Sequence, residues 1–282
     1  MGLSNWCGGI ETDSFRAVQE SVIADSLSGP VNEIFSNYPG FAGGTLVLGA
    51  LFFALQIYCD FSGYSDIAIG VAKLFGIKLM VNFNFPYFSS SIAEFWRKWH
   101  ISLSTWFRDY VYYPLGGSRV ATKTAVRNVF VVFLVSGLWH GANWTFVVWG
   151  ALHALYFIPS FYLKQKKVEV IRSKSSFFLV AIKTAWTFLI VCFAWIFFRS
   201  ESLASAFDYI RHLSPHFTAD YFSSFKYVAF FLMIELLVFF FKRIDYDMAG
   251  YRALRYFSYA VLAFSIISHS TRSGSDFIYF QF

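Results

Sequence analysis

The chain has 282 residues, of which 57% are hydrophobic, 22% are aromatic and 14% are charged. Soluble domains carry about 25% charged residues, so this composition, with a mean hydropathy of +0.51, excludes an ordinary soluble domain and indicates a polytopic membrane protein. The net charge of +6 does not indicate nucleic-acid binding, because the cations lie in short loops between apolar segments and not in a patch with polar base-reading side chains.

Residues 1–40 are polar or weakly amphipathic, and a membrane domain is predicted to follow over residues 41–282. Its apolar segments cover residues 41–58, 64–79, 126–138, 144–163, 177–198, 226–241 and 253–269. We therefore predict an all-α polytopic membrane protein with about seven membrane segments, one of them short and broken. Interfacial amphipathic helices are expected beside these segments, around a central tunnel.

Loops rich and poor in lysine and arginine alternate along these segments. The rich stretch 80–127 contains six such residues, the stretch 164–176 contains five and the stretch 243–255 contains three. Two at most lie in each of the poor stretches, which are 59–62, 139–143, 199–225 and the tail after 270. By the positive-inside rule, the rich stretches are cytoplasmic.

Residues 91–106 predict one amphipathic helix, because apolar side chains recur there at spacings of three, four and seven. Ser91 and Glu94 form a capping-box pattern at its start, and Glu94 and Lys98 form a favourable i,i+4 pair. One interpretation is an interfacial helix whose tryptophans lie at headgroup level.

A second interpretation of this stretch is functional. Arg97, His100 and Arg108 would then line the cytoplasmic mouth of a site for an anionic donor, such as a nucleotide-containing thioester. Residue spacing alone does not choose between the two interpretations.

Residues 136–144 form a polar, glycine-bracketed break between two apolar runs, and His140 lies within it. A titratable histidine is expensive to bury in lipid. The segment 126–138 would rise only about 20 Å, against a hydrocarbon core of about 30 Å, and would end short of the outer face. Irregular backbone at that depth requires a protein-lined or water-filled environment. We therefore expect His140 to face a tunnel open to the outer side.

Five motifs together resemble the membrane-bound O-acyltransferase (MBOAT) family, and within it the branch of alginate O-acetylation proteins. They are QIYCDFSGYSDIAIG at 56–70, NFNFPY at 82–87, FWRKWHISLS at 95–104, YPLGG at 113–117 and GLWHG at 137–141. Members of this family carry further transmembrane helices before the point where this chain begins. The resemblance thus implies that the membrane domain is incomplete at its N-terminal side.

The resemblance implies an O-acetyltransferase of the bacterial inner membrane. It would take an acetyl group from a cytoplasmic donor, acetyl-CoA, and pass it through the membrane towards an exported, alginate-like polysaccharide. No bound cofactor is expected. The implied partners are periplasmic acetyltransferases and the polysaccharide export machinery.

By residue matching, His140 corresponds to the invariant histidine of the family and His100 to its second motif histidine. His140 is expected to act as a general base towards a hydroxyl, or as a nucleophile through a transient acyl-imidazole. His100 would lie on the donor side, with His140 deeper along the path. The residues expected to bind substrate are Trp96, Arg97, Arg108, Trp139 and Asn143.

Other polar residues receive structural interpretations. Asn143 has an alternative role in satisfying backbone groups at the break. The cysteines lack metal-ligand spacing, so no metal is expected. Glu235 stands alone in an apolar run and is left unassigned. Packing or interface roles are predicted for the remaining histidines, which are His153, His212, His216 and His269.

Two further functions compete with acetyl transfer. In a transporter, the broken segment would form a gate, as discontinuous helices do in many carriers; such a fold predicts an inverted repeat, and the sequence shows none. Alternatively, the chain serves only as a non-catalytic assembly partner.

Overall fold

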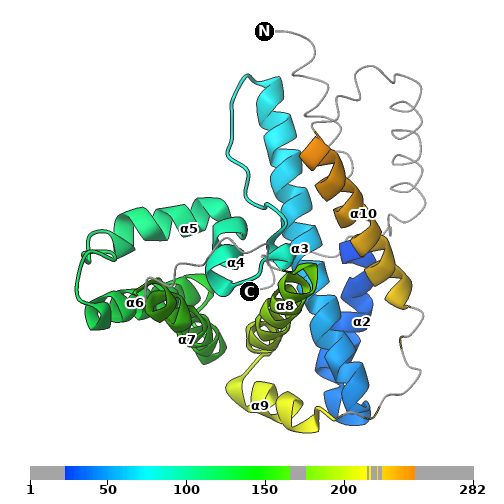
Figure 1. The fold of residues 1–282 in the computed structure, drawn as a ribbon. Helices are drawn as coiled ribbons and strands as arrows, with labels where there is room; N and C mark the ends of the chain where they lie inside the picture. Colours follow the sequence, from blue (N-terminus) through cyan, green and yellow to red (C-terminus); the bar gives the residue numbers. More distant parts are fainter. Residues whose placement is uncertain (1–22, 166–175, 215, 217–220, 222–223, 245–282) are drawn as a thin grey trace. The chain divides into compact units, whose positions relative to one another are not determined.

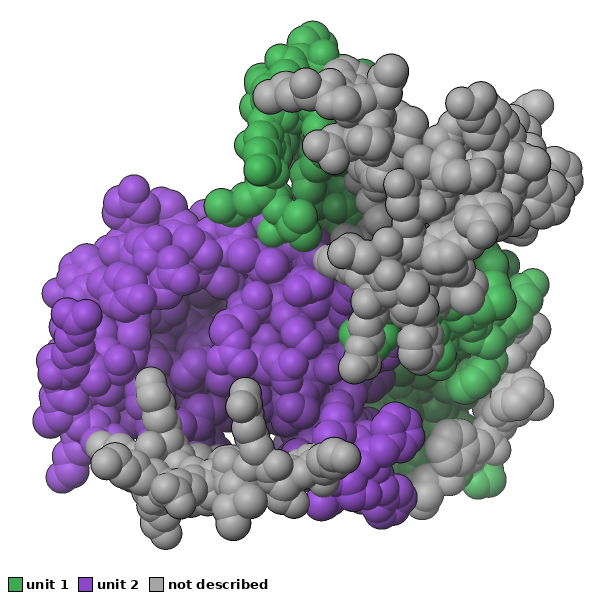
Figure 2. Space-filling model, turned by 45° about the horizontal axis from the view of Figure 1, so that its top comes forward, with its two compact units in different colours: residues 1–81, 212–282 green, residues 82–211 purple. Residues whose placement is uncertain are grey.

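The computed structural model describes residues 23–165, 176–214, 216, 221 and 224–244, and every regular element among them is a helix (Figure 1). The chain divides into two compact units (Figure 2). Unit 1 comprises residues 1–81 and 212–282, and unit 2 comprises residues 82–211. The predicted all-α class is confirmed for the described residues.

Unit 1 contains α2 (Asp25–Ser36), the short 3₁₀ turn η2 (Tyr38–Gly40), α3 (Gly43–Leu74) and α10 (Phe225–Ile244). The prediction of two membrane segments at 41–58 and 64–79 is wrong, because α3 runs through both as one helix of 32 residues. The polar residues read as a loop at 59–62 lie inside this helix, where Ser62 is buried. One lysine-poor loop of the predicted topology therefore does not exist.

Glu235 has a partner that the sequence did not reveal. The hydroxyl of Tyr58 on α3 donates to Oε1 of Glu235 on α10 over 2.9 Å, and both side chains are buried. A buried carboxyl in an apolar helix requires such a hydrogen bond. This contact links α3 to α10 within unit 1.

Unit 2 begins with two short helices, α4 (Ile92–Lys98) and α5 (Ile101–Phe107), preceded by the 3₁₀ turn η3 (Pro86–Phe88). One π-helical turn, η4 (Arg108–Tyr112), extends α5. The chain then reverses into α6 (Thr122–His140), which contacts η4. Asn128 fixes this reversal, because its buried side-chain amide donates to the carbonyl of Leu115 over 2.8 Å.

The rest of unit 2 consists of α7 (Trp144–Gln165), α8 (Phe177–Arg199) and α9 (Leu203–His212), whose last residue belongs to unit 1. Among the described residues, three helices are long and apolar enough to cross a membrane: α3, α7 over Trp144–Phe161, and α8. The predicted count of seven segments is not confirmed. The segment predicted at 253–269 lies outside the described residues.

Helix α6 is longer than predicted. Its 19 residues rise about 28 Å, close to the thickness of a hydrocarbon core of about 30 Å. Most of the added length is the polar start of α6, which includes Lys123, and the depth of His140 in the membrane stays a prediction.

Helices α6 and α7 pack closely enough for their backbones to touch. A Cβ atom added to Gly137 on α6 would clash with the carbonyl oxygen of Phe146, and one added to Gly150 on α7 would clash with the carbonyl oxygen of Phe133. Small residues at a helix crossing allow such an approach. This crossing sets the position of the C-terminal end of α6, where His140 lies.

Replacing Gly150 by leucine is expected to force α6 and α7 apart and to lower the free energy of unfolding by about 3 kcal/mol, the upper end of typical overpacking costs. Thermal unfolding in detergent measures this effect. Gly29 is the matched control, since nothing lies within 4 Å of a Cβ atom placed there. Equal unfolding temperatures for Gly150→Leu and Gly29→Leu would contradict the proposed crossing.

Candidate functional site

His140 is the last residue of α6, and Gly141 follows it as the C-cap. The predicted break at 136–144 is therefore shorter than expected and covers only the three residues between α6 and α7. Residues 136–140 are helical, and Gly137 lets this end of α6 lie against the backbone of α7. The break thus begins just after the histidine instead of surrounding it.

The imidazole of His140 lies among aromatic rings. Its ring centroid is 5.2 Å from that of Trp149 on α7 and 5.1 Å from that of Phe198 on α8, both in edge-to-face geometry. The ring of Phe146 lies 6.4 Å away. Since His140 is only half-buried whereas Trp149 and Phe198 are buried, its imidazole is the accessible polar group of this cluster.

The predicted single helix over 91–106 is interrupted at His100, which is a correction to the sequence analysis. His100 has a φ of 42°, in the left-handed region that non-glycine residues seldom adopt, and it forms the N-cap of α5. The preceding residue, Trp99, is extended and ends α4.

A neighbouring segment satisfies the backbone at this interruption. The carbonyl oxygen of Asn82 accepts from the N–H of Ile101 over 3.0 Å, and its side-chain oxygen accepts from the N–H of Ser102 over 3.1 Å. The N–H of Asn84 donates to the carbonyl of Lys98 over 3.0 Å. These bonds replace the helical ones lost between α4 and α5, so the NFNF sequence holds His100 in its unusual conformation.

The structure brings His100 and His140 into one cluster. The ring of Trp139, at the end of α6, lies 6.4 Å from that of His100 and 4.9 Å from that of its neighbour His140. His100 is buried, and burial lowers the pKa of its imidazole to about 4. It is therefore neutral near pH 7, where it accepts or donates a hydrogen bond without carrying charge.

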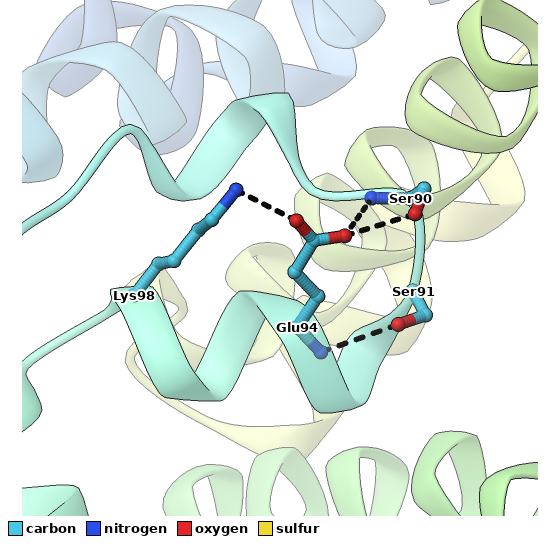
Figure 3. Close-up of polar contacts among 4 residues, drawn as sticks. All are labelled: Ser90, Ser91, Glu94 and Lys98. Carbon is cyan, nitrogen blue, oxygen red and sulfur yellow. Dashed lines mark hydrogen bonds and ion pairs between the residues drawn. The ribbon is translucent and has the colours of Figure 1, made fainter.

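The start of α4 carries the predicted cap (Figure 3). The hydroxyl of Ser91 accepts from the N–H of Glu94 over 3.2 Å, and the carboxylate of Glu94 pairs with Lys98 over 2.8 Å. The same carboxylate accepts from both the N–H and the hydroxyl of Ser90. Partial burial raises the pKa of Glu94, but the bonds from Lys98 and Ser90 outweigh it and the net pKa is lowered. The cap by Ser91 and the Glu94–Lys98 pair are confirmed, whereas the returning bond of the capping box goes to Ser90 and not to Ser91.

The two predicted arginines differ in their surroundings. Arg97 is exposed in the last turn of α4. Arg108 is also exposed, but its guanidinium donates twice to the carboxylate of Asp109, over 2.8 and 3.1 Å, and lies 5.8 Å from the centroid of the Tyr113 ring. Arg97 is therefore better placed than Arg108 to offer an uncompensated charge to an anionic donor. Substrate binding by either residue stays a prediction.

Asn143 serves the backbone at the break. Its side-chain nitrogen donates to the carbonyl of Glu201 over 2.8 Å, and its side-chain oxygen accepts from the N–H of Thr145 over 3.1 Å. This geometry favours the alternative role of Asn143, in which its side chain satisfies backbone groups at the break. Contact with substrate stays a prediction for Asn143, as it does for Trp139.

Two residues of α7 were not assigned to the site from the sequence. Trp149 packs against His140, and His153, one turn further on, contacts Trp149 with ring centroids 4.9 Å apart. Their i,i+4 spacing was visible and places them on one helix face. The sequence did not reveal that this face turns towards His140.

Among the residues that the structure describes, no group of three or more histidine, cysteine, aspartate or glutamate side chains is arranged to hold a metal ion.

The sequence model of the membrane-bound O-acyltransferase family, MBOAT, matches residues 41–207. The chain belongs to this family. The matched region includes the motif histidines His100 and His140, as well as the aromatic cluster around them. Membership agrees with the resemblance found in the five sequence motifs.

Several relatives share the matched region. A probable alginate O-acetylase AlgI of Pseudomonas fluorescens is 45% identical over 186 residues, covering 66% of this chain and 36% of that protein. The peptidoglycan O-acetyltransferase of Helicobacter pylori is 42% identical over 57% of this chain and 30% of its own length. The teichoic acid D-alanyltransferase of Bacillus subtilis is 35% identical over 53% of this chain and 40% of its own length. The chain spans about a third of the length of these relatives.

Proposed function

We propose that this chain carries the acyl-transfer site of a membrane-bound O-acetyltransferase. The enzyme moves an acetyl group from a cytoplasmic thioester, acetyl-CoA, across the membrane for O-acetylation of an exported, alginate-like polysaccharide. One observation carries the proposal: in a member of an O-acyltransferase family, the two motif histidines His100 and His140 lie in one aromatic cluster, bridged by Trp139.

The chemistry follows from the imidazole of His140. An acceptor hydroxyl attacks the carbonyl carbon of the thioester, and His140 takes the hydroxyl proton as the new C–O bond forms. The C–S bond then breaks, and the proton passes to the departing thiolate, which leaves as free coenzyme A. Buried, neutral His100 contributes a hydrogen bond at the same cluster and no second charge.

The proposed setting is the bacterial inner membrane, with the protein crossing it several times. Three apolar helices in the described chain support a membrane location. We further propose that periplasmic acetyltransferases and the polysaccharide export machinery act with this protein, as suits a relative named for alginate O-acetylation. The names of the other relatives, which refer to peptidoglycan and teichoic acid, place acyl transfer to envelope polymers in the same family.

Labelled acetyl-CoA supplied to sealed membrane vesicles tests this function. In inverted vesicles from cells that produce the full-length protein and the polymer, we expect label to accumulate as alkali-labile esters on polymer inside the vesicle. Vesicles lacking the protein are the control and are expected to transfer none. Equal labelling with and without the protein would contradict the function, and loss of polymer export with intact labelling would favour a transporter.

A further inference from the structure

His153 is buried in the middle of the aromatic cluster and makes one specific hydrogen bond. The side chain is 0% exposed, and its Nδ1 accepts from the indole Nε1–H of Trp96 over 3.3 Å. A nitrogen that accepts a hydrogen bond carries no proton, so the geometry assigns the neutral tautomer with its proton on Nε2. His153 therefore does more than fill space, because a phenyl ring of similar size could not accept this bond.

The bond joins α7 to α4. Trp96 lies on α4, four residues before His100, and its ring also packs edge-on against Phe133 of α6, with centroids 5.2 Å apart. Since α4 ends at Lys98, any shift of α4 moves the backbone of His100 directly. Anchoring Trp96 thus fixes the end of α4 from which His100 follows.

The same helix also contacts the other histidine. Trp149, one turn before His153 on α7, packs edge-on against His140 with ring centroids 5.2 Å apart. One face of α7 therefore contacts His140 through Trp149 and α4 through His153. A rigid helix with these two contacts sets the spacing between the two imidazoles of the site.

We propose that His153 is a positioning residue for acyl transfer, which holds α4 on α7 through Trp96 and thereby fixes His100 relative to His140. This inference rests on the proposed function. His153 touches no reacting atom and does not titrate during the reaction. His153 acts on kcat and not on substrate binding. Misplacing a catalytic group by about 1 Å lowers the rate of the chemical step without weakening the binding of a distant part of the substrate.

The variant His153→Phe keeps a ring of similar size and removes the acceptor. In the full-length protein we expect kcat to fall about tenfold, KM for acetyl-CoA to stay unchanged and the midpoints of the pH profile to stay where they are. His153→Gln, whose amide oxygen can accept from Trp96, is expected to recover part of the rate. An unchanged kcat in His153→Phe, or a shifted pH midpoint, would overturn the proposal.

Trp96→Phe tests the same bond from the donor side and serves if His153→Phe does not fold. It is expected to lower kcat to a similar extent, and the double variant is expected to be no slower than either single variant. A higher KM with unchanged kcat would instead assign Trp96 to substrate binding and overturn the positioning role. Tyr156→Phe is the matched control, because the Tyr156 ring contacts His153 with centroids 6.0 Å apart and keeps that contact without its hydroxyl.

The variant His140→Ala distinguishes a failure of the proposed active site from a failure of the positioning role of His153. If it retains acyl transfer, the assignment of His140 as the catalytic base fails, and with it the site that His153 would position. If it loses transfer while His153→Phe keeps a normal kcat, only the positioning role fails. Equal transfer with and without the full-length protein would instead refute the proposed function.

Discussion

Replacing His140 by alanine is expected to lower the rate of acyl transfer by about 10²–10⁴-fold, the range that general-base catalysis supplies. The prediction rests on where the side chain lies: at the C-terminal end of α6, half-buried, with its imidazole against the rings of Trp149 and Phe198. The fold should survive, because the residue is not fully buried and the close approach of the α6 and α7 backbones lies at Gly137 and Gly150. Initial rates of acetyl transfer in membranes that contain the full-length variant measure the loss.

The matched control for this variant is Trp144→Phe. Trp144 is 71% exposed and begins α7 just beyond the break, so the substitution perturbs the same region without touching the imidazole. We expect its rate to stay within about twofold of the unmodified protein, as for surface substitutions in general. A rate for His140→Ala equal to that of Trp144→Phe would show that His140 takes no part in the chemistry.

Replacing His100 by asparagine is expected to lower the rate by about 10²-fold while preserving the turn between α4 and α5. Asparagine tolerates the left-handed backbone that His100 adopts, so this variant removes the imidazole and little else. His100→Ala should lose a similar factor in rate and, in addition, about 1 kcal/mol of folding stability from the backbone conformation. Rates and thermal unfolding measured on both variants separate the two effects.

His100 also predicts a dependence of stability on pH. Burial lowers its pKa in the folded state to about 4, below the ordinary value of 6.5. Between these two values the unfolded chain binds a proton that the folded chain does not, so this residue makes stability fall as the pH is lowered from about 6.5 towards about 4. Its contribution above pH 6.5 is constant. His100→Asn should therefore show a shallower loss of thermal stability over this window, and an identical slope would contradict the buried, neutral imidazole.

The sequence predicted the helical class and the cap of α4, because both depend on local patterns. Apolar runs identified α6, α7 and α8 of unit 2 but not α9, and the Ser91–Glu94 pattern placed the start of α4 correctly. The family motifs selected the two histidines that the structure brings together around Trp139.

The errors arose where distant parts of the chain decide the local structure. Polar residues near Ser62 were read as a loop, although they are buried within α3. The interruption at His100 depends on hydrogen bonds from Asn82 and Asn84, which helical periodicity does not report. The end of α6 at residues 136–140, expected to be part of a break, packs against the backbone of α7 at Gly137. In each case the deciding partner lies on another segment.

Local patterns also identified residues of the site, whereas the contacts of those residues depend on the tertiary structure. The i,i+4 spacing of Trp149 and His153 was present in the sequence, but their role depends on which way α7 faces. Asn143 was a candidate for contact with substrate, and its amide is engaged by the backbone groups of Thr145, at the start of α7, and Glu201, which follows α8. Chemistry-bearing residues can be found from motifs, whereas their partners require the fold.

The acetyl-ester content of the exported polysaccharide, measured in cells that carry His140→Ala in the full-length protein, tests the central claim most directly. We expect the esters to be lost while the amount of secreted polymer is unchanged, because His140 serves acyl transfer and not export. An unchanged ester content would contradict the assignment of His140 as the catalytic base.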